Sequence, residues 1–190
     1  ALMVRVPWSE PWMVMRALDF GAAAVLVPMV STVEQATSVA RAMRYPPHGE
    51  RSFGPKLHAA GDPYDPANGP VCLVMIETQE GLDNVEQIAA VPGIDGLFLG
   101  PVDMGFALGE ITSAADIPGG IVAARSFNAV ERIVAAANST GIAAAAAVFG
   151  PEHEAALAEA GMRIQVSRND VDLLADGARA AMAHLRGNFS

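Results

Sequence analysis

The chain has little of what marks a disulfide framework, a nucleic-acid interface or a membrane span. One of its 190 residues is cysteine, so no disulfide can form within the chain, and this count fits a reducing, cytoplasmic location. Lys and Arg number 12 against 21 Asp and Glu, and the net charge of -9 is spread along the chain without a basic stripe. Phosphates are bound by clustered Lys and Arg, so we expect no nucleic-acid partner. No apolar run approaches the roughly 20 residues that a membrane helix needs, so we expect no membrane partner either.

Several catalytic and cofactor motifs are also absent. The sequence has no GxGxxG, P-loop, nucleophile elbow or HExxH. Its four histidines (His48, His58, His153 and His184) lack metal-ligand spacing, and we expect His153 and His184 to lie on helices, exposed to solvent. The only lysine, Lys56, follows no predicted strand, which argues against a Schiff-base mechanism.

What the chain does have is an alternation of short apolar runs with helix-length amphipathic segments. The predicted strands are 2–6, 24–30, 71–76, 96–99, 142–148 and 163–166. The predicted helices are 10–19, 32–43, 84–90, 128–139, 151–160 and 170–185. Glycines at 21, 141 and 161 stand where a left-handed residue would end a helix. Strand runs that are apolar nearly throughout are typical of parallel strands covered on both faces.

This order of elements predicts an α/β fold in a single domain over residues 1–190. Six βα units in series leave two architectures open, a doubly wound sheet or most of a (β/α)8 barrel. A complete barrel has about 250 residues, so this length fits about six of the eight units. Because the first predicted strand begins at residue 2, we expect the chain to lack an N-terminal part. The irregular stretch 45–70 is long enough to predict a functional lid or an interface element.

Two acidic residues follow predicted strands directly. Glu77 comes after the strand at 71–76, and Asp103 lies just past the strand at 96–99. Catalytic groups of α/β folds gather at the carboxyl ends of parallel strands, so both carboxylates would face one crevice if the strands are adjacent. Hard cations such as Mg²⁺ or Mn²⁺ are bound by one or two carboxylates plus water and substrate oxygens. The structural alternative is that Asp103 caps a helix and Glu77 pairs with an arginine.

Arg5 is a third candidate, because it lies inside a predicted strand between two valines. A buried guanidinium needs a carboxylate or an anionic ligand, so a structural salt bridge and substrate binding both fit. Gly100, before Pro101, would let the backbone approach a ligand closely, and the amides that follow could hold a carboxylate.

Together these segments resemble the HpcH/HpaI aldolase and citrate lyase β-subunit family, the class II pyruvate aldolases, and the related macrophomate synthases. The matching segments are VRVP at 4–7, LVPMV at 26–30, RYPPHGER at 44–51, IET at 76–78, DNV at 83–85, GIDGLFLGPVD at 93–103, and Asp170. They occur in the family's order along essentially the whole chain. The resemblance implies a TIM barrel of the phosphoenolpyruvate/pyruvate type.

The resemblance also implies an activity and a site. Glu77 and Asp103 match the carboxylates that bind a divalent metal (Mg²⁺, Mn²⁺ or Co²⁺), and Arg5 matches the arginine that steadies the pyruvate enolate. Amides near Val102 and Asp103, after Gly100 and Pro101, match those that receive the substrate carboxylate. The implied reaction is cleavage of a 4-hydroxy-2-oxo acid to pyruvate and an aldehyde through a metal-stabilised enolate, or the reverse. Family members are commonly hexamers that exchange their last helix, which implies a homo-oligomer here.

Two residues depart from the family pattern, and other activities stay open. Met75 in the substrate site stands where many members have glutamine, and Gly105 where many have serine. No histidine here matches the one that assists proton transfer in the family. The alternatives are a citrate-lyase-like acyl-CoA lyase, a macrophomate-synthase-like enzyme, and a non-catalytic metal-binding remnant of the barrel.

Overall fold

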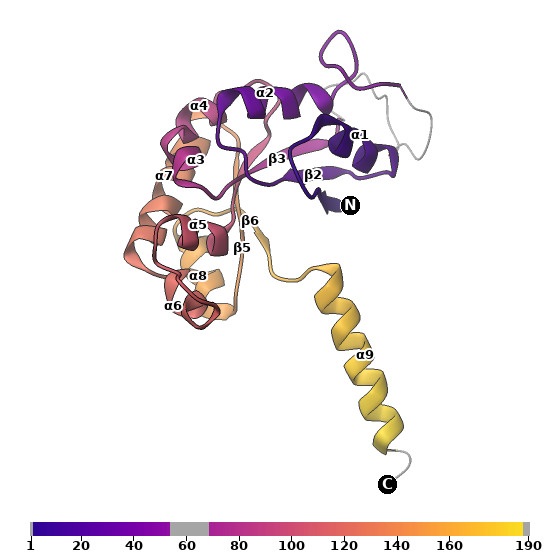
Figure 1. Ribbon diagram of the computed structural model, residues 1–190, viewed down its shortest axis with the longest axis vertical. Helices are drawn as coiled ribbons and strands as arrows, with labels where there is room; N and C mark the ends of the chain where they lie inside the picture. Colours follow the sequence, from indigo (N-terminus) through magenta and orange to yellow (C-terminus); the bar gives the residue numbers. More distant parts are fainter. Residues whose placement is uncertain (1, 54–68, 188–190) are drawn as a thin grey trace.

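The computed structural model describes residues 2–53 and 69–187 and shows a curled sheet of six parallel strands (Figure 1). The strands are β1 (Met3–Arg5), β2 (Ala24–Val27), β3 (Val71–Ile76), β4 (Gly96–Leu99), β5 (Ala143–Ala147) and β6 (Ile164–Val166). Their order in the sheet is their order in the sequence. A doubly wound sheet would reverse that order at a switch point, so the predicted series of βα units winds in one direction.

Helices follow the strands. They are α1 (Pro11–Asp19), α2 (Val33–Ala42), α3 (Gln79–Asp83), α4 (Val85–Ala89), α5 (Pro101–Ala107), α6 (Ile117–Gly120), α7 (Ala124–Thr140), α8 (Pro151–Glu159) and α9 (Asp170–Gly187), with the 3-10 turn η1 (Ala114–Asp116). In Figure 1, α9 extends away from the rest of the molecule. None of the described helices is long and apolar enough to cross a membrane.

Local sequence explains where these helices begin and end. Thr32 accepts a hydrogen bond from the amide of Gln35, whose side chain accepts one from the Thr32 amide, so a capping box starts α2. Gly21, Gly141 and Gly161 follow helices with φ of 90°, 77° and 103°, values that glycine adopts without steric cost. The predicted glycine stops are therefore confirmed.

The two faces of the sheet contribute to two different apolar clusters. The larger cluster lies between the sheet and the helices, and includes Val25, Val74 and Leu97. The smaller one lies on the opposite, inner face, and its buried members are Leu26, Leu73, Met75, Phe98 and Ala145. Alternate residues of the same strand thus serve the two faces, as strand geometry requires.

The predicted strands and main helices are confirmed, except that the strand predicted over 24–30 ends at Val27, before the left-handed Met29. The helix predicted over 128–139 begins at Ala124, and α3, α5 and α6 were not predicted because they are too short to show an amphipathic period. The expected exposure of His153 is wrong: it is only 4% exposed, because α8 turns His153 and Leu157 toward the interior. Lys56, His58 and most of the predicted lid or interface stretch lie outside the described residues.

Candidate active site

The predicted site residues gather at the carboxyl edge of the sheet. Arg5 ends β1, Glu77 directly follows β3, and Gly100 directly follows β4. Strand alternation places them on the inner face, two residues beyond Met3, Met75 and Phe98 respectively, which belong to the inner cluster. Asp103 lies in the first turn of α5, just after Gly100.

The carboxylate of Glu77 is the most deeply buried acidic group of this edge. Glu77 is 2% exposed, and its Oε1 accepts a 2.8 Å hydrogen bond from the backbone N–H of Met29, which follows β2. Its Oε2 is buried and has no hydrogen-bond partner among the described residues. Burial raises the pKa of Glu77, and the negative charge of Asp103 adds to this, whereas the Met29 hydrogen bond and the positive charge of Arg5 lower it. These couplings place Asp103 and Arg5 in the electrostatic range of Glu77.

Gly100 leaves the space that the carboxylate of Glu77 occupies. A Cβ at position 100 would lie 2.2 Å from Oε2 of Glu77 and 3.1 Å from the terminal methyl carbon of Met75. Any side chain there would displace Glu77, so glycine is required. The Met75 side chain also ends near position 100, and its thioether supplies no hydrogen-bond donor there.

Asp103 and Arg5 do not fill the structural roles considered for them. Gly100 is the N-cap of α5, so Asp103 does not cap that helix. Both Arg5 and Asp103 are exposed at the carboxyl edge. Neither forms an ion pair or a side-chain hydrogen bond with any residue in 2–53 or 69–187, and Glu77 pairs with no arginine there. Two charged side chains of opposite sign are thus available to a ligand.

The residues present fit a divalent cation. The described residues include no group of three or more His, Cys, Asp or Glu side chains that could enclose a metal. A protein cage is not what Mg²⁺ or Mn²⁺ requires, because one or two carboxylates, waters and substrate oxygens complete its coordination. A buried carboxylate oxygen with no partner, such as Oε2 of Glu77, is costly unless something positive binds it.

Sequence reasoning missed the contribution of Met29. Its backbone N–H, rather than its side chain, contacts Glu77, and its φ of 58° is the only positive value among the described non-glycine residues. A residue type that favours left-handed backbone would have been a signal, but methionine is not one. At Gly105, where many family members have serine, Ile111 occupies the space of a side chain. A Cβ at position 105 would lie 2.4 Å from Cδ1 of Ile111.

These features define an α/β protein that gathers carboxylates at one edge of a curled parallel sheet. A sequence model of the HpcH/HpaI aldolase/citrate lyase family matches residues 1–175, and the chain belongs to that family. The predicted resemblance is therefore confirmed.

The relatives include enzymes with named activities. The hydroxypyruvate/pyruvate aldolase of Roseovarius nubinhibens is 40% identical over 149 residues, which cover 75% of this chain and 57% of the relative. The chain thus spans a little over half the length of that protein. A family member from Burkholderia cenocepacia J2315 has a structure with a TM-score of 0.78 and 32% identity, covering 97% of this chain and 73% of that one. Macrophomate synthase gives a TM-score of 0.74 and 30% identity, covering 99% and 67%.

Proposed function

We propose that this protein is a metal-dependent carbon–carbon lyase, an aldolase that cleaves a 4-hydroxy-2-oxo acid to pyruvate and an aldehyde or joins the two. The observation that carries the proposal is the buried carboxylate of Glu77, with one unpartnered oxygen, in electrostatic reach of Asp103 and Arg5. The aldolase name of the Roseovarius relative supports the same class of reaction.

Each residue at the carboxyl edge has a chemical role in this proposal. Glu77 and Asp103 would hold the divalent ion (Mg²⁺, Mn²⁺ or Co²⁺). When bound, such an ion withdraws electrons from the 2-oxo group and carboxylate of a substrate, which weakens the carbon–carbon bond. Arg5 would stabilise negative charge that grows on the substrate oxygen as that bond breaks, and interactions that strengthen in the transition state raise the rate.

The start of α5 would receive the substrate carboxylate. The amides of Val102 and Asp103 lie in the first turn of the helix, where backbone N–H groups have no partner within the helix. Proline at position 101 suits the first helical turn because it has no N–H to leave unsatisfied. Gly100 adds no side chain between these amides and the metal ligands.

Met75 would make the floor of this site apolar. Its side chain lies with Leu73 and Phe98 on the inner face, directly below Glu77. A thioether cannot donate or accept strongly, so a substrate group that meets Met75 gains dispersion contact rather than a hydrogen bond. We therefore assign Met75 to the substrate site as an apolar contact.

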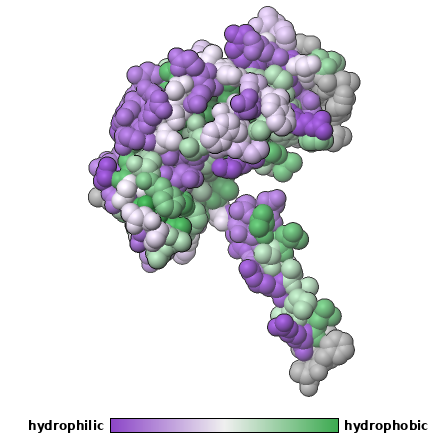
Figure 2. Space-filling model, in the orientation of Figure 1, coloured by the Kyte–Doolittle hydropathy of each residue, from purple (hydrophilic) through white to green (hydrophobic). Residues whose placement is uncertain are grey.

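The proposal extends to the whole protein's architecture and assembly. We propose a (β/α)8 barrel of which this chain supplies about six βα units, since the units run in one direction around the curled sheet. We also propose a cytoplasmic location, which the lone buried Cys72 fits. We also propose a homo-oligomer, a hexamer by resemblance, in which α9 is exchanged. Figure 2 shows apolar side chains along α9, and Leu173, Leu174 and Met182 on it are 62%, 76% and 51% exposed. Leu174→Glu should lower the sedimentation coefficient of the assembly.

The activity is tested with 4-hydroxy-2-oxo acids of different chain length, with released pyruvate measured by reduction to lactate. Cleavage that needs Mg²⁺, Mn²⁺ or Co²⁺ and stops on chelation is the expected result. A protein that is folded and binds metal but releases no pyruvate would instead be a non-catalytic metal-binding barrel. Cleavage of an acyl-CoA substrate in preference to every 2-oxo acid would favour the citrate-lyase-like reaction.

A further inference from the structure

The segment 28–31, which connects β2 to α2, has an unusual backbone at the point where it meets Glu77. Met29 adopts the left-handed backbone conformation with a φ of 58°. Residues other than glycine, asparagine and aspartate rarely adopt this conformation. This conformation accompanies the 2.8 Å hydrogen bond from the Met29 N–H to Oε1 of Glu77. A backbone outlier beside a functional group is a reason to look for a role of that backbone.

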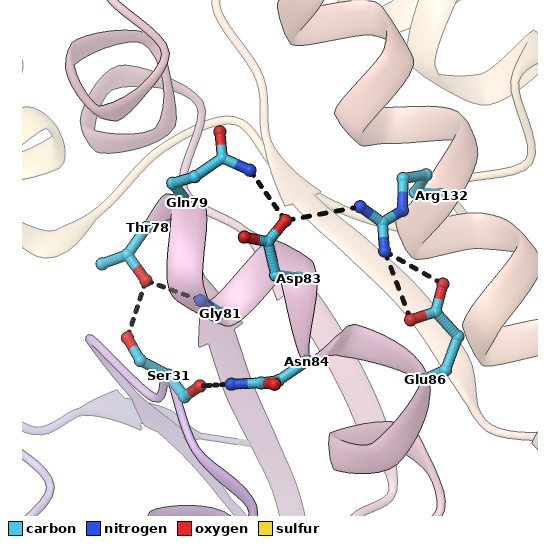
Figure 3. A network of polar contacts seen from close by, with 8 residues as sticks. All are labelled: Ser31, Thr78, Gln79, Gly81, Asp83, Asn84, Glu86 and Arg132. Atoms are coloured by element: carbon cyan, nitrogen blue, oxygen red, sulfur yellow. Dashed lines mark hydrogen bonds and ion pairs between the residues drawn. The ribbon is translucent and has the colours of Figure 1, made fainter.

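Neighbouring contacts hold this segment against the end of β3. The Val30 amide donates to the Met75 carbonyl at 3.3 Å, and the hydroxyls of Ser31 and Thr78 lie 2.6 Å apart. The side-chain amide of Asn84 donates to the Ser31 carbonyl at 2.8 Å. Figure 3 shows Ser31 between Thr78 and Asn84, joined to both. Val30 and Ser31, the two residues after Met29, are therefore both hydrogen-bonded to β3 or to residues that follow it, which holds the backbone on the C-terminal side of Met29.

A glycine in α3 permits this close approach. A Cβ at Gly81 would lie 3.0 Å from the Val30 carbonyl oxygen, 3.1 Å from Oγ1 of Thr78 and 3.4 Å from Cα of Ser31. Those distances are tighter than ordinary van der Waals contact, so a side chain at position 81 would push the segment away from β3. The packing around the segment is as specific as its hydrogen bonds.

We propose that segment 28–31 is a positioning element for the Glu77 carboxylate. The left-handed Met29 directs its N–H at Oε1, and Ser31, held by Thr78 and Asn84, keeps the backbone in that conformation. Oε1 is thereby occupied, and Oε2 is the oxygen that can bind a cation. This inference rests on the proposed metal-dependent function and adds residues that act through Glu77 rather than on the substrate.

Positioning Glu77 should strengthen metal binding because orienting a free carboxylate costs free energy when the ion binds. A ligand whose outer contacts fix its direction loses little freedom when the ion arrives, and loss of such contacts typically weakens metal binding about 10- to 100-fold. Met29 makes this contact through its backbone, so the conformation at position 29 should matter more than the side chain.

Two substitutions of Met29 separate conformation from side chain, with Mn²⁺ affinity measured by the electron paramagnetic resonance signal of free Mn²⁺. Met29→Gly removes the side chain but suits a positive φ, and Mn²⁺ affinity should stay within about threefold of the wild type. Met29→Val keeps an apolar side chain but is β-branched and disfavours positive φ. Its Kd should rise about 10- to 100-fold. Equal affinities for the two variants, whether strong or weak, would overturn the proposal.

Ser31→Ala provides a second test that does not depend on how Met29→Val folds. It removes the hydroxyl that meets Thr78, and the Kd for Mn²⁺ should rise while the urea midpoint shows the protein folded. Ser139→Ala is the matched control, because the Ser139 hydroxyl bonds only locally, to the Ala136 carbonyl in α7. A Ser31→Ala affinity equal to that of Ser139→Ala would contradict the positioning role. A wild-type protein that binds no Mn²⁺ would overturn the proposed function itself, and the positioning role with it.

Discussion

The inner and outer faces of the sheet are built from alternate residues of the same strands, yet they do different things. On the outer face, Val74 and Leu97 are fully buried in the continuous core beneath the helices. On the inner face, Met75 and Phe98 belong to a smaller cluster, and Glu77 and Gly100 directly follow the strands that carry them. Outer positions are satisfied by apolar packing, whereas Glu77 retains a buried oxygen without a partner. Because strand residues alternate between the two faces, outer positions stabilise the fold and inner positions carry the candidate site. Substitutions on the outer face should change the free energy of unfolding, and those on the inner face should change metal binding.

The largest effect on binding is expected from Glu77→Gln on the inner face. The change removes the negative charge and puts an amide where the ion would bind, so the Kd for Mn²⁺ should rise by more than about 100-fold, beyond the losses typical of outer contacts. Isothermal titration calorimetry measures this directly. The metal-free variant should be at least as stable as the wild type, because it no longer buries an ionisable group. Unchanged Mn²⁺ affinity would remove Glu77 from the metal site.

The corresponding change on the outer face is Leu97→Ala. It leaves a cavity between β4 and the helices and should lower the free energy of unfolding by about 2–5 kcal/mol. Urea denaturation measures the loss. At urea concentrations below the unfolding transition, the Kd of Leu97→Ala for Mn²⁺ should match that of the wild type. A metal affinity that falls with stability would show that the two faces are not separable.

Because the pKa of Glu77 is raised, metal-free stability and Mn²⁺ affinity should change in opposite directions with pH. Because the folded protein holds this proton more tightly than the unfolded chain, whose value is the ordinary 4.5, the Glu77 contribution to metal-free stability is full below that value. It is lost as the pH rises through the folded pKa. Metal binding needs the carboxylate, so Mn²⁺ affinity should fall as the pH drops through the same range, by at most about tenfold per pH unit for one proton. In Glu77→Gln, both of these Glu77-linked changes should disappear.

The smallest effect is expected from Met75→Gln. An amide at this position could donate to the unpartnered Oε2 of Glu77, which would lower the pKa of that carboxyl. The pH at which half of the Mn²⁺ affinity is lost should move to a lower value. The melting temperature should change by only a few degrees, because the two side chains have similar length. A half-loss pH that does not move would mean that the amide fails to reach Glu77.

Much of the fold and part of the site were predictable from the sequence, for identifiable reasons. Continuous apolar runs located the strands, and their carboxyl ends located Glu77 and Asp103, because parallel strands align those ends along one edge of the sheet. Arg5 was singled out as a candidate because a charged residue between two valines in a predicted strand is conspicuous. Gly100 was recognised as permissive, although the position of Oε2 of Glu77 where a Cβ of residue 100 would lie depends on the tertiary structure.

The support around Glu77 was not predictable in the same way. The Met29 hydrogen bond joins residues 48 positions apart, and the Ser31 contacts join residues 47 and 53 apart. A local sequence pattern does not indicate which residues at the ends of two different strands will form hydrogen bonds with each other. Methionine also has no preference for left-handed backbone, so the conformation at position 29 is imposed by tertiary contacts. The exposure of His153 was predicted wrongly for a related reason, since the orientation of α8 decides which of its polar residues is buried.

The measurement that tests the central claim most directly is exchange of the methyl protons of pyruvate in D₂O, followed by proton NMR. It needs no aldehyde partner and reports enolate formation alone. We expect exchange with Mg²⁺, Mn²⁺ or Co²⁺, none with chelator, and losses of more than about tenfold in Glu77→Gln, Asp103→Asn and Arg5→Gln at saturating metal. Absence of exchange in a folded, metal-loaded protein, or exchange that survives Glu77→Gln, would contradict the account.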